Sequence, residues 1–411
     1  MGWLEDYRTI PDELPRYNMP FVYEGDMNSA VVNAHIPIPN PRIRTYSNII
    51  NKLSDKVGLV VISHQGRPSK PDCISLDEHK YQMEEIITKK RIEIVRQPDF
   101  YTEATREKIK RLQPGEILLY DNIRLDPDET KPFNLDTSKF VKYFKGIAGG
   151  INDRLPAAHR DNDSMVGISY LEPTFIGPRA IYELNVLEYA KSKLHKGGAG
   201  IQLGGGKADK SEKYLPHLAG LAEIFLTGVP GMLKCYVEGY SLGPKNDNFL
   251  KGKIKPQTIE AFKSLKGKNI HRPIDFVVED KEKGIIRTVP VEKMCDCEYE
   301  VCDIGEETVE MMGTRMKLLP LLIVGGPAGK VDEGKMNFVK LIDKCYGVET
   351  IVLGGDSIWS LDKEGLLGPM EAIGSKIMLA GGAFYHGLCD MPYPCFEHLK
   401  KLKPDNNRYL I

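Results

Sequence analysis

The first half of the chain carries arginines and histidines in short polar segments that follow apolar runs. Residues 64–68 read His-Gln-Gly-Arg-Pro, residues 121–124 read Asp-Asn-Ile-Arg, and residues 151–160 end in His-Arg. With the first arginine of residues 41–44, these segments supply Arg42, His64, Arg67, Arg124, His159 and Arg160. Guanidinium groups bind carboxylate and phosphate oxygens through paired hydrogen bonds, and histidines add further donors. The set predicts a compact site for a small phosphorylated acid, although each residue taken alone also suits an ordinary surface loop.

The second half of the chain carries glycine-rich segments in comparable places. Residues 203–207, 325–329, 354–357 and 380–383 each follow a short apolar run and contain two or three glycines. Backbone N–H groups in such turns can approach phosphates at helix N-termini, whereas an ordinary tight turn between a strand and a helix gives the same pattern. Neither G-x-x-x-x-G-K-[ST] nor a complete G-x-G-x-x-G is present, which excludes a P-loop or a dinucleotide fingerprint as the explanation.

Two charged residues stand beside these glycines. Asp356 follows a pair of glycines, where a magnesium ion held by nucleotide phosphates would need an oxygen ligand. Lys207 follows three glycines and could neutralise charge on a phosphoryl group during transfer. A helix cap is the alternative for Asp356, and a solvated side chain is the alternative for Lys207.

The elements that must position these residues alternate along most of the chain. Strands are expected at residues 21–23, 57–63, 91–95, 116–120, 201–203, 222–227, 321–324, 350–353 and 376–379. Helical spacing of apolar residues predicts helices at residues 76–90, 103–112, 178–194 and 336–345. The alternation indicates an α/β fold built on parallel sheets, which bind ligands beyond the carboxyl ends of their strands.

The length of 411 residues is typical of two or three domains. The helix expected at residues 178–194, followed by glycines, suits a connector between two α/β halves, and a helix within one larger domain is the alternative. Lys and Arg number 56 against 57 Asp and Glu, which gives a net charge of −1. Thirteen arginines nevertheless fall in residues 1–195 and four in the remaining 216. This skew favours an acidic ligand for the first half.

Composition excludes several classes of protein. Near-neutral charge argues against nucleic acid or an anionic membrane as a partner. The first ten residues lack the apolar core of a secretory signal, and no apolar run of about 20 residues is present, so a cytoplasmic protein is expected. The eight cysteines suit reduced, structural thiols. Cys295, Cys297 and Cys302 are close in sequence, but no C-x₂-C pair or nearby histidine completes a zinc site.

Taken in order, these segments resemble the phosphoglycerate kinase family from about residue 20 to about residue 385, most closely its archaeal branch. Residues 25–29 correspond to the family's Val-Asp-Phe-Asn turn, residues 64–68 to His-Leu-Gly-Arg-Pro, and residues 121–124 to Glu-Asn-Leu-Arg. Residues 152–160 correspond to the family's Asn-Asp-Ala-Phe-x-x-Ala-His-Arg motif. In the second half, the matching segments are residues 204–207, 303–308, 326–329 and 354–357.

The resemblance implies two Rossmann-like parallel-sheet domains that face each other across a hinged cleft. The expected parts are an N-terminal acidic-substrate domain at residues 1–177, an inter-domain helix at 178–195, a C-terminal nucleotide-binding domain at 196–385 and a tail at 386–411 that returns to the first domain. A monomer with Mg²⁺ and ATP or ADP is expected. Direct phosphoryl transfer from ATP to the carboxylate of 3-phosphoglycerate is the activity that the resemblance implies.

Site residues follow from the same resemblance. The residues expected to bind 3-phosphoglycerate are Asp26, Asn28, Arg42, His64, Arg67, Arg124, His159 and Arg160. Those expected to bind nucleotide are Gly205, Gly206, Lys207, Gly326, Pro327, Asp332, Gly354, Gly355, Asp356, Ser357, Gly381 and Gly382. Arg42 would hold the acceptor carboxylate, Lys207 would accompany the phosphoryl group, and Asp356 would bind magnesium. Because a carboxylate acceptor is already ionised at neutral pH, no general base is required.

Departures from the family pattern concentrate on the nucleotide side. Gly325 replaces an asparagine, Lys330 an apolar residue, Asp332 the ribose-binding glutamate, Ser211 a second lysine, and Met378 and Leu379 a Ser-Thr pair. The simplest interpretation is phosphoglycerate kinase of glycolysis and gluconeogenesis. The alternatives are a related kinase with another small carboxylate or nucleotide as substrate, and a catalytically silent protein that keeps the anion pocket.

Overall fold

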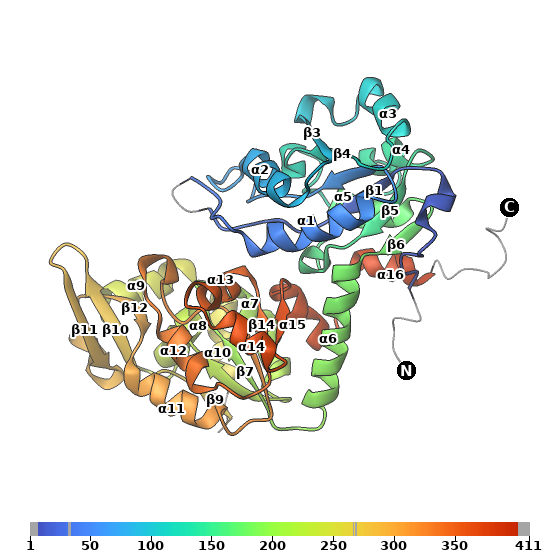
Figure 1. Cartoon of the computed structure of the whole chain (residues 1–411). Helices are drawn as coiled ribbons and strands as arrows, with labels where there is room; N and C mark the ends of the chain where they lie inside the picture. The colour runs from blue at the N-terminus through green and yellow to red at the C-terminus, as the bar shows by residue number, and fades with distance from the viewer. Residues whose placement is uncertain (1–6, 32–33, 266, 268, 402–411) are drawn as a thin grey trace. The chain divides into compact units, whose positions relative to one another are not determined.

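The computed structural model describes residues 7–31, 34–265, 267 and 269–401 (Figure 1). Contacts between residues divide the chain into two compact units. The first unit comprises residues 1–188 and 390–411, and the second comprises residues 189–389. Helix α6 (Pro178–Leu194) contains the point at which the first unit gives way to the second.

The first unit is built around a six-stranded parallel sheet with the strand order β3-β4-β2-β1-β5-β6. Its strands are β1 (Phe21–Glu24), β2 (Leu59–Ile62), β3 (Arg91–Val95), β4 (Glu116–Tyr120), β5 (Gly149–Asn152) and β6 (Thr174–Ile176). Every residue of β1, β2 and β5 is buried, because helices cover both faces of the sheet.

The helices of the first unit connect these strands in turn (Figure 1). They are α1 (Pro41–Ser54), α2 (Asp77–Ile86), α3 (Glu103–Lys110), α4 (Lys139–Phe144) and α5 (Asp163–Gly167), with short 3₁₀ helices η2 (Leu14–Tyr17), η3 (Gln97–Asp99), η4 (Ile123–Leu125), η5 (Leu155–Ala157) and η6 (Ile168–Tyr170). The last helix within the described residues, α16 (Pro394–Lys401), also packs on this unit. There the hydroxyl of Ser169 donates to the carbonyl oxygen of Cys395 at 2.8 Å, and the rings of Tyr170 and His398 stack at 3.8 Å.

The second unit contains a six-stranded parallel sheet with the order β15-β14-β13-β7-β8-β9. Its strands are β7 (Ala199–Leu203), β8 (Glu223–Leu226), β9 (Ile270–His271), β13 (Leu321–Gly325), β14 (Thr350–Leu353) and β15 (Lys376–Met378). The helices are α7 (Asp209–Leu218), α8 (Gly228–Val237), α9 (Pro244–Lys253), α10 (Pro256–Ser264), α11 (Glu306–Met316), α12 (Asn337–Lys344), α13 (Gly355–Lys363), α14 (Leu367–Ala372), α15 (Gly382–Leu388), η7 (Val291–Asp296) and η8 (Val331–Glu333).

A small antiparallel sheet in the second unit was not expected from the sequence. It has the order β11-β10-β12, with β10 (Asp275–Asp280), β11 (Ile285–Pro290) and β12 (Glu300–Ile304). Strand β11 lies at its edge and exposes Ile286, Arg287 and Thr288 in succession. A strand with so little burial lacks the apolar alternation by which strands are recognised in a sequence.

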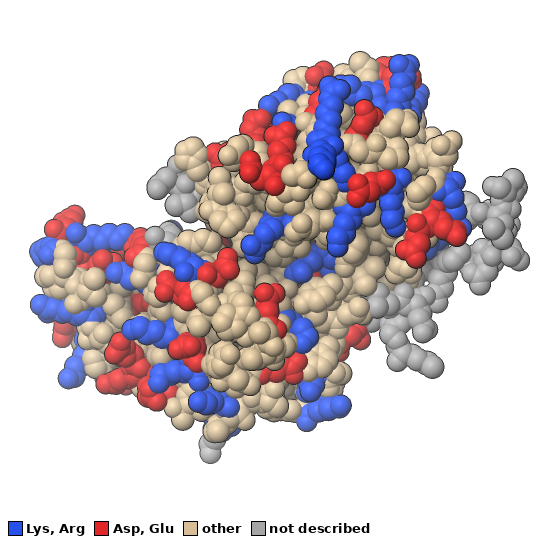
Figure 2. All heavy atoms as spheres, viewed as in Figure 1, with Lys and Arg blue, Asp and Glu red and all other residues tan. Residues whose placement is uncertain are grey.

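The predicted fold class of parallel-sheet α/β units is confirmed. The helix predicted at residues 76–90 is shorter, since α2 ends at Ile86 and Lys89 takes a left-handed conformation with φ of 65°. Within the described residues, no helix is both long enough and apolar enough to cross a membrane. On the face that Figure 2 shows, basic and acidic side chains are interspersed, as the net charge suggests.

Candidate active site

Four predicted side chains of the first unit follow neighbouring strands. Asp26 follows β1, His64 follows β2, Arg124 follows β4 and Arg160 follows β5. These strands are parallel and adjacent in the order β4-β2-β1-β5, so the four residues share one edge of the sheet. Arg42 joins them from the first turn of α1.

Arg42 is hydrogen-bonded to the carboxylate of Asp26. Its Nη1 donates to Oδ2 of Asp26 at 2.6 Å, and Asp26 is 4% exposed. Helix α1 begins here because Pro41 occupies its first position and the side chain of Asn40 accepts from the backbone N–H groups of Arg42 and Ile43, at 3.0 and 3.2 Å. The cap thereby fixes the point from which the guanidinium enters the site.

His64 is buried beside this pair, with Nδ1 3.8 Å from Oδ1 of Asp26. Burial, followed by the positive charges of Arg154, Arg160 and Arg42, lowers the pKa of His64 well below its ordinary value. The ring is therefore neutral at pH 7 and acts by hydrogen bonding.

Gly66 connects two of the predicted residues, Asn28 and Arg124. Its N–H donates to Oδ1 of Asn28 at 2.8 Å, and its carbonyl oxygen accepts from the guanidinium of Arg124. A Cβ atom at Gly66 would lie 2.1 Å from the carbonyl oxygen of Asp72, and φ is +67°. Only glycine fits this turn, which holds Asn28 and Arg124 on either side of one peptide.

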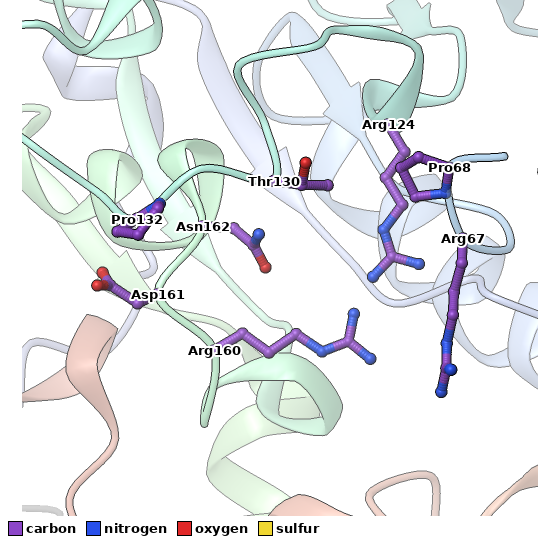
Figure 3. Close-up of a pocket in the computed structure, with 8 residues that line it drawn as sticks. All are labelled: Arg67, Pro68, Arg124, Thr130, Pro132, Arg160, Asp161 and Asn162. Carbon is purple, nitrogen blue, oxygen red and sulfur yellow. The ribbon is translucent and has the colours of Figure 1, made fainter.

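Three arginines line a pocket of about 450 Å³ on the first unit. Its walls are Arg67, Pro68, Arg124, Thr130, Pro132, Arg160, Asp161 and Asn162. Figure 3 shows the guanidinium groups of Arg67, Arg124 and Arg160 pointing toward the same space. Within the described part of the chain, none of the three forms an ion pair with a carboxylate. Burial lowers the pKa of Arg160, as expected for a cation that awaits a counter-ion.

The predicted acid-side residues thus fall into two adjoining clusters. Asp26 is hydrogen-bonded to Arg42 and lies 3.8 Å from His64, whereas Arg67, Arg124 and Arg160 line the pocket. Asn28 is linked to the second cluster through Gly66. His159 is half-buried, immediately before Arg160, and does not line the pocket.

Two residues behind His64 were missed by the sequence prediction. Arg154 and Glu24 are buried and form an ion pair, and Arg154 also contacts the His64 ring. Glu24 looks like the last residue of an ordinary strand. Arg154 lies between Asn152-Asp153 and His159-Arg160, where the family motif quoted above has alanine. That departure is the signal that could have indicated it.

In the second unit, glycine turns at the carboxyl ends of β7, β13 and β14 pack directly on one another. The N–H of Gly205 donates to the carbonyl oxygen of Pro327 at 2.7 Å. Gly326 has φ of +82°, and a Cβ atom there would lie 2.4 Å from the carbonyl oxygen of Gly204. The N–H of Gly326 donates to the buried hydroxyl of Ser357 at 2.9 Å. Ser357 therefore joins two turns.

The turns after β14 and β15 are also close together. A Cβ atom at Gly381 would lie 3.7 Å from Cα of Gly354. Gly355 is the first residue of α13, and Gly382 is the first residue of α15. Two helix N-termini, each preceded by a glycine, are thus available to an anion at this edge.

Lys207 and Asp356 are exposed at the same edge of the sheet. Among the described residues, neither side chain forms an ion pair, and no cluster of three or more His, Cys, Asp or Glu residues could hold a metal. Mg²⁺ in kinases is commonly held by one or two carboxylates, with phosphate oxygens and water completing its shell. An exposed Asp356 in the first turn of α13 fits that mode.

A largely apolar pocket of about 320 Å³ adjoins the glycine turns of the second unit. Gly205, Gly206 and Pro327, from the predicted set, line it together with Gly228, Val229, Met232, Lys245, Asn246, Phe249, Phe276, Glu300, Val301, Cys302, Ala328, Gly329 and Lys330. The apolar walls come from α8, α9 and β10, whose residues were indistinguishable from core in the sequence. A flat aromatic ring is the kind of group that such walls suit.

Lys330 forms an ion pair with Glu300. Its Nζ lies 2.6 Å from Oε1 of Glu300, and both residues line the pocket. Asp332 belongs to η8, two residues further along, and its side chain lies outside the described part of the structure. The departure at Lys330 therefore introduces an ion pair into the wall of the pocket.

The structure gives a steric reason for Gly325. A Cβ atom there would lie 2.5 Å from the hydroxyl oxygen of Tyr385 and 3.3 Å from Cβ of Leu353. Tyr385 is buried on α15 and occupies space that any larger residue at position 325 would need. Met378 and Leu379, which replace a Ser-Thr pair, are buried too.

The model of the phosphoglycerate kinase family matches residues 20–389. The phosphoglycerate kinase of Pyrococcus furiosus is 27% identical over 401 residues, which cover 93% of this chain and 95% of the relative. The phosphoglycerate kinase of Sulfurisphaera tokodaii is 29% identical over 409 residues, which cover 93% and 96%. The crystal structure of phosphoglycerate kinase from Pyrococcus horikoshii OT3 matches with a TM-score of 0.81 at 23% identity, covering 93% of this chain and 96% of that chain. This structural likeness extends over both units.

Proposed function

Because the chain belongs to the phosphoglycerate kinase family, a family of kinases that use ATP or ADP as co-substrate, we propose that it transfers a phosphoryl group between ATP and the carboxylate of 3-phosphoglycerate. The products are ADP and 1,3-bisphosphoglycerate. The observation that best supports this acceptor is the pocket lined by three arginines, none of which pairs with a carboxylate of the described residues. In this proposal the protein works as a cytoplasmic monomer in glycolysis or gluconeogenesis.

The first unit binds the acid in this proposal. Arg67, Arg124 and Arg160 bind the phosphate, because three converging guanidinium groups suit a dianion better than a single carboxylate. Arg42 holds the acceptor carboxylate in the adjoining cluster, and neutral His64 donates a hydrogen bond to the acid. Asp26, Asn28 and His159 complete this side of the site.

The second unit binds the nucleotide. The apolar pocket accepts the base, and the glycine turns approach the phosphates. The residues assigned here are Gly205, Gly206, Lys207, Gly326, Pro327, Asp332, Gly354, Gly355, Asp356, Ser357, Gly381 and Gly382. Asp356 would hold Mg²⁺, which neutralises phosphate charge when bound. Lys207 stabilises the negative charge of the moving phosphoryl group.

Catalysis then depends on position and charge. The acceptor carboxylate is ionised at pH 7, so no residue has to remove a proton from it. Arg42 orients the carboxylate oxygen for attack, and Lys207 offsets the charge that develops on the transferred group. This division of work explains why the site is rich in guanidinium groups and glycine turns.

An assay that couples ADP formation to a spectroscopic signal tests the proposal. Purified protein with Mg-ATP and 3-phosphoglycerate should release ADP, and Arg42→Ala or Lys207→Ala should abolish that release. An absence of turnover with any nucleotide would contradict the proposal. If 3-phosphoglycerate still raised the melting temperature of that inactive protein, a silent binding protein would become the better account.

A second candidate, a kinase with altered nucleotide preference, is favoured by one observation. The Lys330–Glu300 ion pair lines the proposed base pocket, where the family pattern has an apolar residue at position 330. Such a pair can both donate and accept hydrogen bonds at the edge of a base. A panel of ATP, GTP, CTP and UTP distinguishes the candidates, since kcat/KM should be highest for ATP under the first proposal.

A further inference from the structure

Arg154 is a wholly buried arginine at the centre of the first unit. It is 1% exposed and follows β5, immediately behind the acid-binding cluster. Its Nη1 donates to Oε1 of Glu24, the last residue of β1, and its Nη2 contacts Nδ1 of His64. One guanidinium therefore joins a buried carboxylate to the ring that faces the proposed acid.

The surroundings of Arg154 hold it in one orientation. Glu24 is 0% exposed, and its Oε1 also lies 2.7 Å from the hydroxyl of Ser164. That hydroxyl lies 3.0 Å from Oε1 of Glu129 as well. Burial raises the pKa of Glu129 to about 8, and the ion pair of Arg154 is made with Glu24. An unpaired arginine at this depth would be strongly unfavourable.

The contact with His64 determines which ring nitrogen carries the proton. A guanidinium has donors and no acceptor, so Nδ1 of His64 must accept from Arg154. A neutral imidazole has one N–H, which is then on Nε2. No hydrogen bond among the described residues engages Nε2, which leaves this N–H for a ligand.

We propose that Arg154 is a positioning residue that holds His64 in the Nε2–H tautomer, so that the ring donates to the phosphorylated acid. The identity of that acid rests on the proposed function, whereas the tautomer does not. A purely structural role for Arg154 is the competing explanation.

The ring of His64 reports the first part of the proposal directly. Nitrogen NMR of the full chain with ¹⁵N-labelled histidine, recorded without substrate and compared with His64→Gln for assignment, should show an unprotonated Nδ1 and a protonated Nε2. Arg154→Lys keeps a cation for Glu24 but removes the second donor arm, so it should shift the His64 ring toward a mixture of tautomers. An Nδ1–H tautomer in the unmodified protein, or no change in the variant, would overturn the proposal.

Kinetics test the second part. Arg154→Lys should raise the KM for 3-phosphoglycerate by roughly tenfold or more, as expected for loss of a hydrogen bond to a charged group, with the KM for ATP unchanged. In a His64→Ala background the same substitution should have no further effect on that KM, since Arg154 acts through the ring. Additive effects in the two backgrounds would instead indicate a structural role and contradict the proposal.

Two further variants keep the test decisive. If Arg154→Lys fails to fold, the pair Glu24→Gln with Arg154→Met removes both buried charges together and should give the same change in KM. Arg106→Met is the matched control, because Arg106 donates to the carbonyl oxygen of Tyr143 in the same unit. It should leave the KM and the His64 ring unchanged. Failure of the unmodified protein to use 3-phosphoglycerate would refute the proposed function, and the ring spectrum would still test Arg154.

Discussion

Nη1 of Arg42 donates to Oδ2 of Asp26 at 2.6 Å, and this contact holds the guanidinium in place before any acid is present. Asp26 is 4% exposed, so water offers the carboxylate little competition. A guanidinium has five N–H donors in a planar fork, a geometry that suits carboxylate oxygens. Under the proposed function, Asp26 orients Arg42 toward the acceptor carboxylate.

Replacement of Arg42 by lysine should show that this geometry is needed in addition to charge. Lysine keeps the positive charge but cannot contact Asp26 and an acceptor carboxylate through one planar group. We expect kcat/KM for the acid to fall by about 10²–10³, the range found when one preorganised donor is removed from an active site. Arg44→Lys, an exposed position on the same helix, is the control and should keep full activity. An active Arg42→Lys enzyme would contradict the role of Arg42.

The arginine pocket should bind phosphate groups without any nucleotide. Single substitutions Arg67→Ala, Arg124→Ala and Arg160→Ala should each weaken binding of 3-phosphoglycerate by roughly tenfold or more, since each removes a charge-assisted hydrogen bond. Isothermal titration at two ionic strengths measures this, and affinity should fall as salt rises. Arg91→Ala, at an exposed position, is the comparison and should bind as the unmodified protein does. If the three variants bound 3-phosphoglycerate as tightly as the unmodified protein does, the phosphate group would have to bind outside this pocket.

Family membership and the parallel-sheet fold could be predicted from the sequence, because both depend on local patterns. Apolar strand cores at residues 91–95 and 116–120 and the helix at residues 178–194 appear in the structure at those positions. The Asp26–Arg42 contact could not be predicted in the same way. It joins a turn after β1 to the start of α1, and only the tertiary structure sets the distance between them.

Residues behind the site were beyond sequence reasoning for a different reason. Arg154 was one of 13 arginines in the first half, and an arginine in a loop is usually solvated. Its burial depends on Glu24, 130 positions earlier, at the end of the neighbouring strand. The walls of the apolar pocket, such as Phe249 and Phe276, look like ordinary core residues until α9 and β10 are placed. Roles that arise from such long-range pairing carry no local pattern.

Glu129 should make the stability of the first unit depend on pH. Its pKa is raised by burial to about 8, against about 4.3 in an unfolded chain, so the folded protein retains a proton that the unfolded chain has released. Stability from this group is complete below about pH 4.3 and is lost as pH rises to 8. Glu129→Gln carries no titrating proton. Its free energy of unfolding should therefore exceed that of the unmodified protein at pH 8.5, and the difference should be smaller at pH 5.5.

Thermal unfolding at the two pH values measures this difference. Each pKa unit corresponds to about 1.4 kcal/mol, so we expect the advantage of Glu129→Gln to grow by at least ~2 kcal/mol between them. Glu85→Gln, an exposed carboxyl on α2, should unfold in parallel with the unmodified protein at both values. An advantage of Glu129→Gln that shrank with rising pH would mean that Glu129 is ionised in the folded protein.

Gly325 and Tyr385 should be coupled energetically. A Cβ atom at position 325 would lie 2.5 Å from the Tyr385 hydroxyl oxygen, so Gly325→Ala should destabilise the second unit by about 1–3 kcal/mol, the usual range for overpacking. In a Tyr385→Phe background the nearest ring atom, Cζ, lies 3.4 Å from that Cβ atom, an ordinary contact. In that background Gly325→Ala should lower the free energy of unfolding by much less.

Gly206→Ala is the matched control, because no heavy atom lies within 4 Å of its Cβ position, and it should change stability by less than about 0.5 kcal/mol. Scanning calorimetry of the four proteins measures the cycle, and equal costs in both backgrounds would show that another contact, such as Leu353, excludes side chains from position 325.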